Sequence, residues 1–249
     1  MSAMLLVLIR VSGVVAFAPF FSSTAFPVRA KAVFALAVSY VLVPLAAGVP
    51  HAVLELTFPA LLGELAVGLV YGLTLAFLNE MLLFAGQIAG MQFSFSLVNL
   101  IDPSSSIQTP LLGELFQLMG TLTILAAGLD RLLLASLARS LRVVPPGSFA
   151  MTAVTTTAIV RATGGIFLAA LELAAPVLAA TLLVEIAIAL LGKLSPQLPV
   201  MSLTVPAKTL TGFALLIGSL ALWPHFIEAR FGGLLEFAER LLVAHTVER

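Results

Sequence analysis

The ionisable side chains of this sequence form no catalytic or metal-binding pattern. No cysteine is present, which excludes disulfides, thiolate metal sites and cysteine nucleophiles. The separations of Glu64, Tyr71 and Glu80 are loose and more typical of a structural than of a catalytic arrangement. The histidines are scattered, without the HExxH spacing of a zinc site: His51, His225 and His245. We therefore expect a protein that is not an enzyme, with no catalytic residue, no metal and no cofactor.

Two other carboxylates, Glu172 and Glu185, interrupt an apolar run over residues 164–193. Each would cost roughly 2.5–3.5 kcal/mol if it faced lipid, so such residues normally face a bundle interior, a cavity or a subunit interface. A straight helix over this run would be about 45 Å long, well beyond a hydrocarbon core of about 30 Å. Pro176 lies in its middle and removes a backbone hydrogen bond, which predicts a kink or a break.

The composition places these groups in a membrane protein. The chain is 61% hydrophobic and 10% charged, whereas soluble domains are about a quarter charged. Its net charge of zero gives no indication of nucleic-acid binding. We predict an all-α, integral membrane-type protein of long, kinked helices and hairpins. The apolar helices are expected at about residues 3–21, 32–49, 56–86, 111–129, 164–193 and 208–223.

Other segments have patterns with two interpretations each. Residues 130–145 and 225–249 combine apolar stripes with charged residues. This is typical of interfacial or partner-bound amphipathic helices, although a solvated helix with one core-facing stripe is the simpler interpretation. Gly63, Gly68 and Gly72 indicate either a close helix-packing face or the ordinary glycine content of membrane helices.

The loop charges conflict with a simple topology. Basic residues accompany the loops after the first, fourth and fifth predicted apolar helices. Under simple alternation the first and fifth loops lie on one side and the arginine-rich fourth on the other, against the positive-inside rule. Either one apolar run is a re-entrant hairpin, or the helices do not sit in lipid as ordinary spans.

A polar, turn-rich insert at residues 87–110 is the clearest interruption of the apolar pattern. Irregular backbone at membrane depth is tolerated only where protein buries it or where it lines an aqueous cavity. Phe93, Phe95 and Leu97 alternate with smaller residues, so an extended loop would present its bulky side chains to one side. These side chains either gate a conduit by excluding water or pack within an ordinary helix connector. A transporter with broken helices is a competing interpretation, although no convincing inverted repeat supports it.

Read with its flanks, the insert resembles the FliR family of flagellar export-gate proteins. It is similar, less closely, to the SctT-type proteins of virulence type III secretion systems. The resemblance covers essentially the whole chain and rests on APFFSSTAFPVRAKAVFALAVS at 18–39, GxxxGMQFSF…DP…TPLLGEL at 86–115, and ALELAAPVLAATLLVEIAIALLGKLSPQLPV…PAK at 170–208. The chain departs from the family at Pro199, where members commonly carry a polar residue.

The resemblance implies a single domain over residues 1–249 that joins a FliP-like part, 1–163, to a FliQ-like helical hairpin and amphipathic tail, 164–249. Such a chain would assemble with several copies of FliP and FliQ into a helical, pore-forming gate. The gate would belong to the flagellar basal body at the bacterial inner membrane, near FlhB and FlhA. It would pass unfolded flagellar proteins in flagellar type III export. Partner helices, rather than lipid, would then surround Glu172 and Glu185 at subunit interfaces.

The resemblance also assigns roles to residues of the insert. The family's plug loop, equivalent here to residues 87–110, would close the pore with Gly90, Met91, Phe93, Phe95, Leu97 and Val98. Its turn would consist of Asp102, Pro103 and Ser104. A loop toward the cytoplasmic entrance would contain Pro196, Gln197 and Lys208. An SctT-like virulence component and, less favoured, a secondary transporter are the alternatives.

Overall fold

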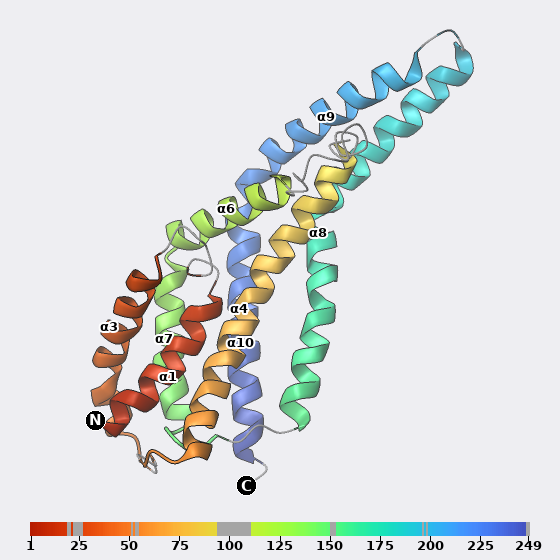
Figure 1. Cartoon of the computed structure of the whole chain (residues 1–249). Coiled ribbons are helices and arrows are strands. Elements are labelled where there is room, and N and C mark those ends of the chain that lie inside the picture. The colour runs from red at the N-terminus through yellow and green to blue at the C-terminus, as the bar shows by residue number, and fades with distance from the viewer. Residues whose placement is uncertain are drawn as a thin grey trace, which may run out of the picture. The chain divides into compact units, whose positions relative to one another are not determined.

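The protein is all-α in the part that its computed structural model describes. That part comprises residues 1–18, 21, 27–50, 52, 55–93, 111–149, 153–195, 197 and 199–247, and no strand occurs within it. The predicted fold class is therefore confirmed. The elements are α1 (Ser2–Phe17), α3 (Val28–Ala47), α4 (Phe58–Gln92), α6 (Leu111–Ala126), α7 (Leu129–Val143), α8 (Ala153–Leu194), α9 (Val200–Ser219), the 3-10 turn η1 (Leu220–Leu222) and α10 (Trp223–Val247) (Figure 1).

Several of these helices are long and apolar enough to cross a membrane, so the chain is a membrane protein. α6 and α7 are separated only by Ala127 and Gly128 and are bent by 71° relative to each other, and together they are long and apolar enough to form a broken span or a re-entrant loop. This pair is a candidate for the re-entrant hairpin, which was one of the two explanations for the conflicting loop charges. The four single candidates are Val28–Ala47, Phe58–Gln92, Ala162–Leu194 and Ser202–Val243.

The polar insert starts later than the sequence predicts. α4 continues beyond residue 86 to Gln92, so residues 87–92 are helical and the predicted boundary was wrong. The side chains of Gln87, Met91 and Gln92 do not end a helix, because glutamine and methionine are among the better helix formers.

α8 and α9 also begin earlier than predicted. α8 starts at residue 153 rather than 164 and stays helical through Pro176, so the chain does not break there, and a kink at Pro176 stays a prediction. α9 starts at residue 200 rather than 208 and contains Pro206. The threonines before residue 164 lower helix propensity by less than about 1 kcal/mol each, which tertiary packing readily overrides. The amphipathic segments 130–145 and 225–249 do form helices, α7 and α10, with core-facing stripes that include Leu137 and Phe231.

The chain divides into two compact units that share helices. Unit 1 comprises Met1–Asn79, Ile124–Gly164 and Ile227–Arg249, and unit 2 comprises Glu80–Thr123 and Gly165–Phe226. Each boundary falls inside a helix, so α4, α6, α8 and α10 each contribute to both units. The division at residues 163 and 164 into FliP-like and FliQ-like parts rests on the family resemblance and stays a prediction.

Unit 1 is built on close contacts between helix backbones. α1 packs on α3, and α3 packs on α7. A Cβ atom at Gly13 of α1 would lie 2.9 Å from the carbonyl carbon of Gly68 in α4, which is closer than real Cβ contacts. Cβ atoms at Gly63 and Gly72 would likewise lie 2.5 Å from the Phe149 carbonyl oxygen and 2.6 Å from the Gly13 carbonyl oxygen. Gly68 and Gly72 of α4 therefore form a helix-packing face against α1, as one of the two interpretations predicted, whereas Gly63 meets the segment after α7.

Unit 2 leaves much of its apolar surface uncovered. Aromatic contacts hold its helices together, with ring centroids 5.0 Å apart for Phe84 and Phe167 and 4.7 Å apart for Phe116 and Trp223. In an 18-residue apolar stretch of Ala162–Leu194, however, only 17% of the residues are buried within the chain. Lipid or other protein chains must cover the remainder, because so much apolar surface is unfavourable in water.

Candidate functional site

Phe93 closes the C-terminal end of α4 and is buried. Its N–H group donates to the carbonyl oxygen of Ala89 at 3.1 Å, so the helical hydrogen-bonding pattern extends to it. Its own carbonyl oxygen accepts a hydrogen bond from Thr209 Oγ1 of α9 at 3.1 Å. The last carbonyl groups of a helix have no partner within that helix, so the Thr209 hydroxyl caps α4.

The Phe93 ring occupies space that Gly212 of α9 leaves open. A Cβ atom at Gly212 would overlap the ring, and the Phe213 ring centroid lies 5.0 Å from that of Phe93. Phe93 is consequently 2% exposed. We call Thr209, Gly212 and Phe213 the Phe93 seat. The seat explains why one of the six predicted plug residues lies inside the chain's own core.

Gln92 links the same end of α4 to α8. The Thr181 hydroxyl oxygen lies 3.3 Å from Gln92 Oε1 and 2.9 Å from the carbonyl oxygen of Val177. Its single proton is shared between these acceptors. Contacts from α8 and α9 thus fix the point in unit 2 from which the chain continues into residues 94–110.

Glu185 of α8 and Lys208 of α9 form an ion pair, in which Lys208 Nζ donates to Glu185 Oε1. The Lys208 side chain is 9% exposed, whereas the Glu185 side chain is 46% exposed. A nearly buried ammonium group is therefore neutralised by a carboxylate that also faces outward. The sequence predicted both residues but assigned them to different sites, and the structure brings them together. Lys208 lies within α9, so its predicted place in a loop was wrong.

The other predicted residues in the described part are mostly on the surface. Met91 is exposed, as are Glu172 and Gln197. Gly90 is half-buried, and a Cβ atom there would make ordinary contact with Leu112 of α6 at 3.7 Å. No close approach of backbones therefore requires glycine at this position.

The remaining predicted site residues lie outside the described residues. Their roles in the plug, in its turn and in the entrance loop stay predictions. They are Phe95, Leu97, Val98, Asp102, Pro103, Ser104 and Pro196.

Unit 1 contains a buried polar cluster that the sequence did not predict. Arg10 Nε lies 2.6 Å from Glu64 Oε2, and Arg10 Nη2 lies 2.9 Å from Glu64 Oε1. The guanidinium group also donates to Ser140 Oγ at 3.2 Å and to the Val144 carbonyl oxygen at 3.1 Å. Glu64 Oε1 accepts a further hydrogen bond from the Gly147 N–H group at 2.9 Å. The cluster ties α1 to α4 and to the C-terminal end of α7.

The sequence did carry a signal for this cluster. Arg10 is the single charge of its apolar run, and Glu64 is one of only two charges, with Glu80, in the run over residues 56–86. An isolated charge in an apolar helix normally pairs with another charge or with backbone carbonyl groups. Opposite charges in two such runs are therefore candidates for each other.

A second polar link connects α4, α7 and α10. The Ser136 hydroxyl oxygen lies 2.8 Å from Glu239 Oε1 and 3.3 Å from the Tyr71 hydroxyl oxygen. Arg139 Nη1 donates to Glu239 Oε2 at 3.2 Å. Ser136 stands one helical turn before Ser140, so one face of α7 serves both polar groups. Across the described ranges, no three His, Asp or Glu side chains are grouped so as to hold a metal ion.

The chain matches the family described as bacterial export proteins, family 1, over residues 1–234. It is 26% identical over 228 residues to the flagellar biosynthetic protein FliR of Escherichia coli strain K12, which covers 90% of this chain and 86% of that relative. The FliR of Caulobacter vibrioides is 28% identical over 225 residues, 87% of each chain. The FliR of Bacillus subtilis is 29% identical over 163 residues, 62% of this chain and 61% of the relative.

These matches confirm the resemblance to FliR and favour the flagellar over the virulence system, because all three relatives are flagellar proteins. They extend along the membrane-length helices that the structure describes. The chain belongs to family 1 of the bacterial export proteins and is a membrane component of the flagellar export apparatus.

Proposed function

We propose that this chain forms, together with FliP and FliQ, the channel through which unfolded flagellar proteins cross the inner membrane. The channel stands in the flagellar basal body, with FlhB and FlhA beside its cytoplasmic entrance. Family membership and the large uncovered apolar surface of unit 2 support the proposal. The chain's part in export is to build and gate a conduit, without a catalytic step of its own.

One observation carries this proposal: α8 presents carboxylates on the outside of an apolar, membrane-length helix. Glu172 and Glu185 are both exposed on the chain, and so are Leu171 and Leu183 beside them. Glu185 is paired with Lys208 within the chain, but an exposed carboxylate that faced lipid would still cost roughly 2.5–3.5 kcal/mol. The leucines, in turn, need apolar cover. Helices of partner subunits satisfy both requirements, since they supply apolar surface together with polar partners.

The segment after Phe93 is the proposed plug. A loop that obstructs a pore and then moves aside needs a fixed end, and the Phe93 seat supplies one at the end of α4. Gly90 and Met91 belong to this anchored end. The obstruction itself is assigned to Phe95, Leu97 and Val98, and the turn to Asp102, Pro103 and Ser104.

The entrance loop is proposed at the connection between α8 and α9. Gln197 is exposed there, and Lys208 holds the first turns of α9 to α8 through Glu185. Gln197 and Pro196 form the surface that faces the cytoplasmic components FlhB and FlhA, and the nearly buried Lys208 supports it from α9.

Co-purification tests the proposal. A tagged chain expressed with FliP and FliQ should elute from detergent as one complex with a fixed subunit ratio. Glu172→Leu should lower the recovery of this complex, because a partner's polar group loses the carboxylate. Glu236→Leu is the matched control, since Glu236 is an exposed carboxylate on α10 rather than α8. Recovery of the chain as a stable monomer in the presence of both partners would contradict the proposal.

A further inference from the structure

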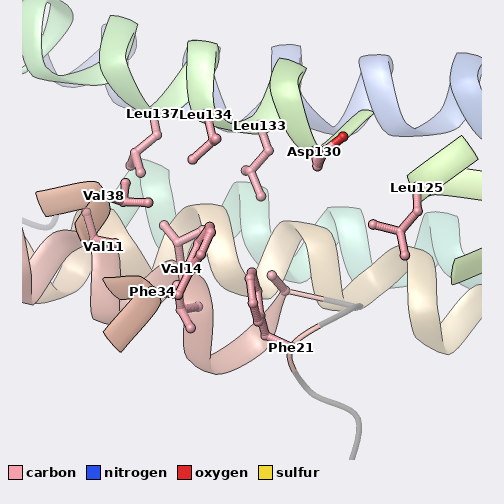
Figure 2. Close-up of a pocket in the computed structure, with 12 residues that line it drawn as sticks. Val11, Val14, Phe21, Phe34, Val38, Leu125, Asp130, Leu133, Leu134 and Leu137 are labelled. Carbon is pink, nitrogen blue, oxygen red and sulfur yellow. The ribbon is translucent and has the colours of Figure 1, made fainter. Parts of the chain in front are cut away.

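α1, α3 and α7 enclose an apolar cavity of about 280 Å³ within unit 1, and the proposed gate does not use it (Figure 2). Its floor consists of buried side chains of α1 and α7: Val11, Val14, Leu133 and Leu137. Its rim consists of half-buried side chains: Phe21, Phe34, Val38 and Leu134. The cavity is therefore closed toward the core and open toward the surroundings of α3.

The surroundings of α3 are apolar as well. Val28–Ala47 is a candidate membrane span, and only 22% of an 18-residue apolar stretch of it is buried within the chain. Val33, Leu36 and Val41 are exposed along it. Cavities lined by aliphatic and aromatic side chains stay dry and bind apolar ligands, even at about 150 Å³. An apolar ligand that enters beside a membrane-spanning helix comes from the bilayer, so its apolar part is an acyl chain.

Two opposite charges stand at one end of the cavity. Asp130 is the charged residue among the cavity-lining side chains. Figure 2 shows Val38 near Leu137, and Phe34 shifted from it toward Asp130. Lys31 precedes Phe34 by three residues and so lies on the same face of α3, one turn further toward the Asp130 end.

The charged groups of Lys31 and Asp130 are both free to bind a ligand. Lys31 and Asp130 are half-buried, and within the described part of the chain neither side chain forms an ion pair or a hydrogen bond. A half-buried charge without a partner is costly, and the cost is removed by an ion of opposite sign.

The geometry points to a binding site for a zwitterionic aminophospholipid of the phosphatidylethanolamine class. One acyl chain occupies the cavity, Lys31 binds the phosphate, and the Asp130 carboxylate accepts a hydrogen bond from the ammonium group. This headgroup carries both charges that the cavity end requires. An anionic lipid such as phosphatidylglycerol brings no cation to Asp130, and a choline headgroup has no N–H group to donate.

Competition between two lipids tests the site. The full chain is reconstituted in nanodiscs of equal parts phosphatidylethanolamine and phosphatidylcholine, and the retained lipid is identified by native mass spectrometry. We expect retention of phosphatidylethanolamine above its bulk share. Asp130→Asn should lower the ratio of retained phosphatidylethanolamine to phosphatidylcholine about tenfold, the effect of losing one charge-assisted hydrogen bond. Lys31→Gln should lower the retention of both lipids, because both carry the phosphate.

Two controls keep the test decisive. Arg131→Gln changes an exposed neighbour of Asp130 that does not line the cavity, and it should leave the lipid ratio unchanged. Val38→Phe should fill the cavity and abolish retention. If that variant does not fold, the wild-type melting temperature is the second readout, since a ligand of the folded state raises it. Phosphatidylethanolamine must raise it more than phosphatidylcholine does.

Several outcomes would overturn the proposal. They are retention of the two lipids in their bulk ratio, an Asp130→Asn ratio equal to that of the wild type, and equal shifts in melting temperature. Absence of phospholipid from both the isolated chain and the assembled gate would also overturn it, and would indicate that an apolar protein segment covers the cavity.

Discussion

Arg10 and Glu64 form a two-point ion pair between α1 and α4, with Nε 2.6 Å from Oε2 and both side chains fully buried. Further hydrogen bonds join the pair to Ser140 of α7 and to the segment after α7. A buried pair of this kind adds little net stability compared with apolar residues, but losing one partner leaves an uncompensated charge. The pair therefore specifies which parts of α1 and α4 lie against each other.

Removal of one partner of this pair should be strongly destabilising. We expect Glu64→Leu to lower the free energy of unfolding by about 3–5 kcal/mol, because the Arg10 guanidinium stays buried without its carboxylate. Denaturant unfolding of the detergent-solubilised chain measures the change.

A double variant is the control for that prediction. Arg10→Leu combined with Glu64→Leu should unfold less readily than Glu64→Leu alone, since both charges are then gone. Arg240→Ala removes an exposed pair with Glu236 and should change stability by about 1 kcal/mol or less. If the double variant is as unstable as the sum of the two single ones, the two charges are not coupled.

The glycine face of α4 gives a second prediction. A Cβ atom at Gly68 would overlap the Arg10 carbonyl oxygen, so Gly68→Ala should push α1 and α4 apart at a cost of roughly 1–3 kcal/mol. Gly232→Ala in α10 is the matched control, because no atom lies within 4 Å of the added methyl group. It should be neutral or stabilise by up to about 1 kcal/mol. Equal effects in a thermal unfolding assay would show that the close approach does not matter.

The ion pair between α8 and α9 gives a third prediction. Glu185→Leu leaves the nearly buried Lys208 ammonium without its carboxylate, and we expect less complex with FliP and FliQ on size-exclusion chromatography. The charge-swapped double variant, Glu185→Lys with Lys208→Glu, should recover part of the loss. A double variant no better than the single one would indicate that Glu185 acts on a partner chain and not through Lys208.

The Phe93 seat gives a fourth prediction, which concerns the plug. Deletion of residues 93–98 should raise ion leakage through the assembled gate, measured as conductance in a planar bilayer. Gly212→Leu should raise it less, because the added side chain displaces the Phe93 ring while the loop stays in place. Leu210→Ala, at an exposed position of α9, should leave the conductance as in the wild type. Unchanged conductance in the deletion variant would remove the plug role but not membership in the gate.

The sequence predicted the helical class and most of the helices, because long apolar runs allow few other structures in a membrane. The predicted positions of several helix ends were wrong. α4 continues to Gln92, where Thr181 and Thr209 meet it from distant parts of the chain, and local residue patterns do not contain such contacts.

The site residues show the same difference: single charged residues could be predicted from the sequence, but their partners could not. Glu185 and Lys208 could be picked out one at a time, since a charge in an apolar helix is conspicuous. Their pairing depends on how α8 and α9 align, which the sequence alone does not give. The buried pair of Arg10 and Glu64, separated by 54 residues, depended on tertiary contacts for the same reason.

The sharing of helices between the two compact units bears on how the chain is made. Ribosomes deliver about 5–20 residues per second, and domains usually fold in the order of their synthesis. Here Glu239 is synthesised roughly 10–30 s after Tyr71 of unit 1, and only then can the link between them through Ser136 form. Unit 1 therefore finishes only after unit 2 has been translated. Until then its early helices depend on the insertion machinery, or on partner subunits already in place, to keep their polar groups out of lipid.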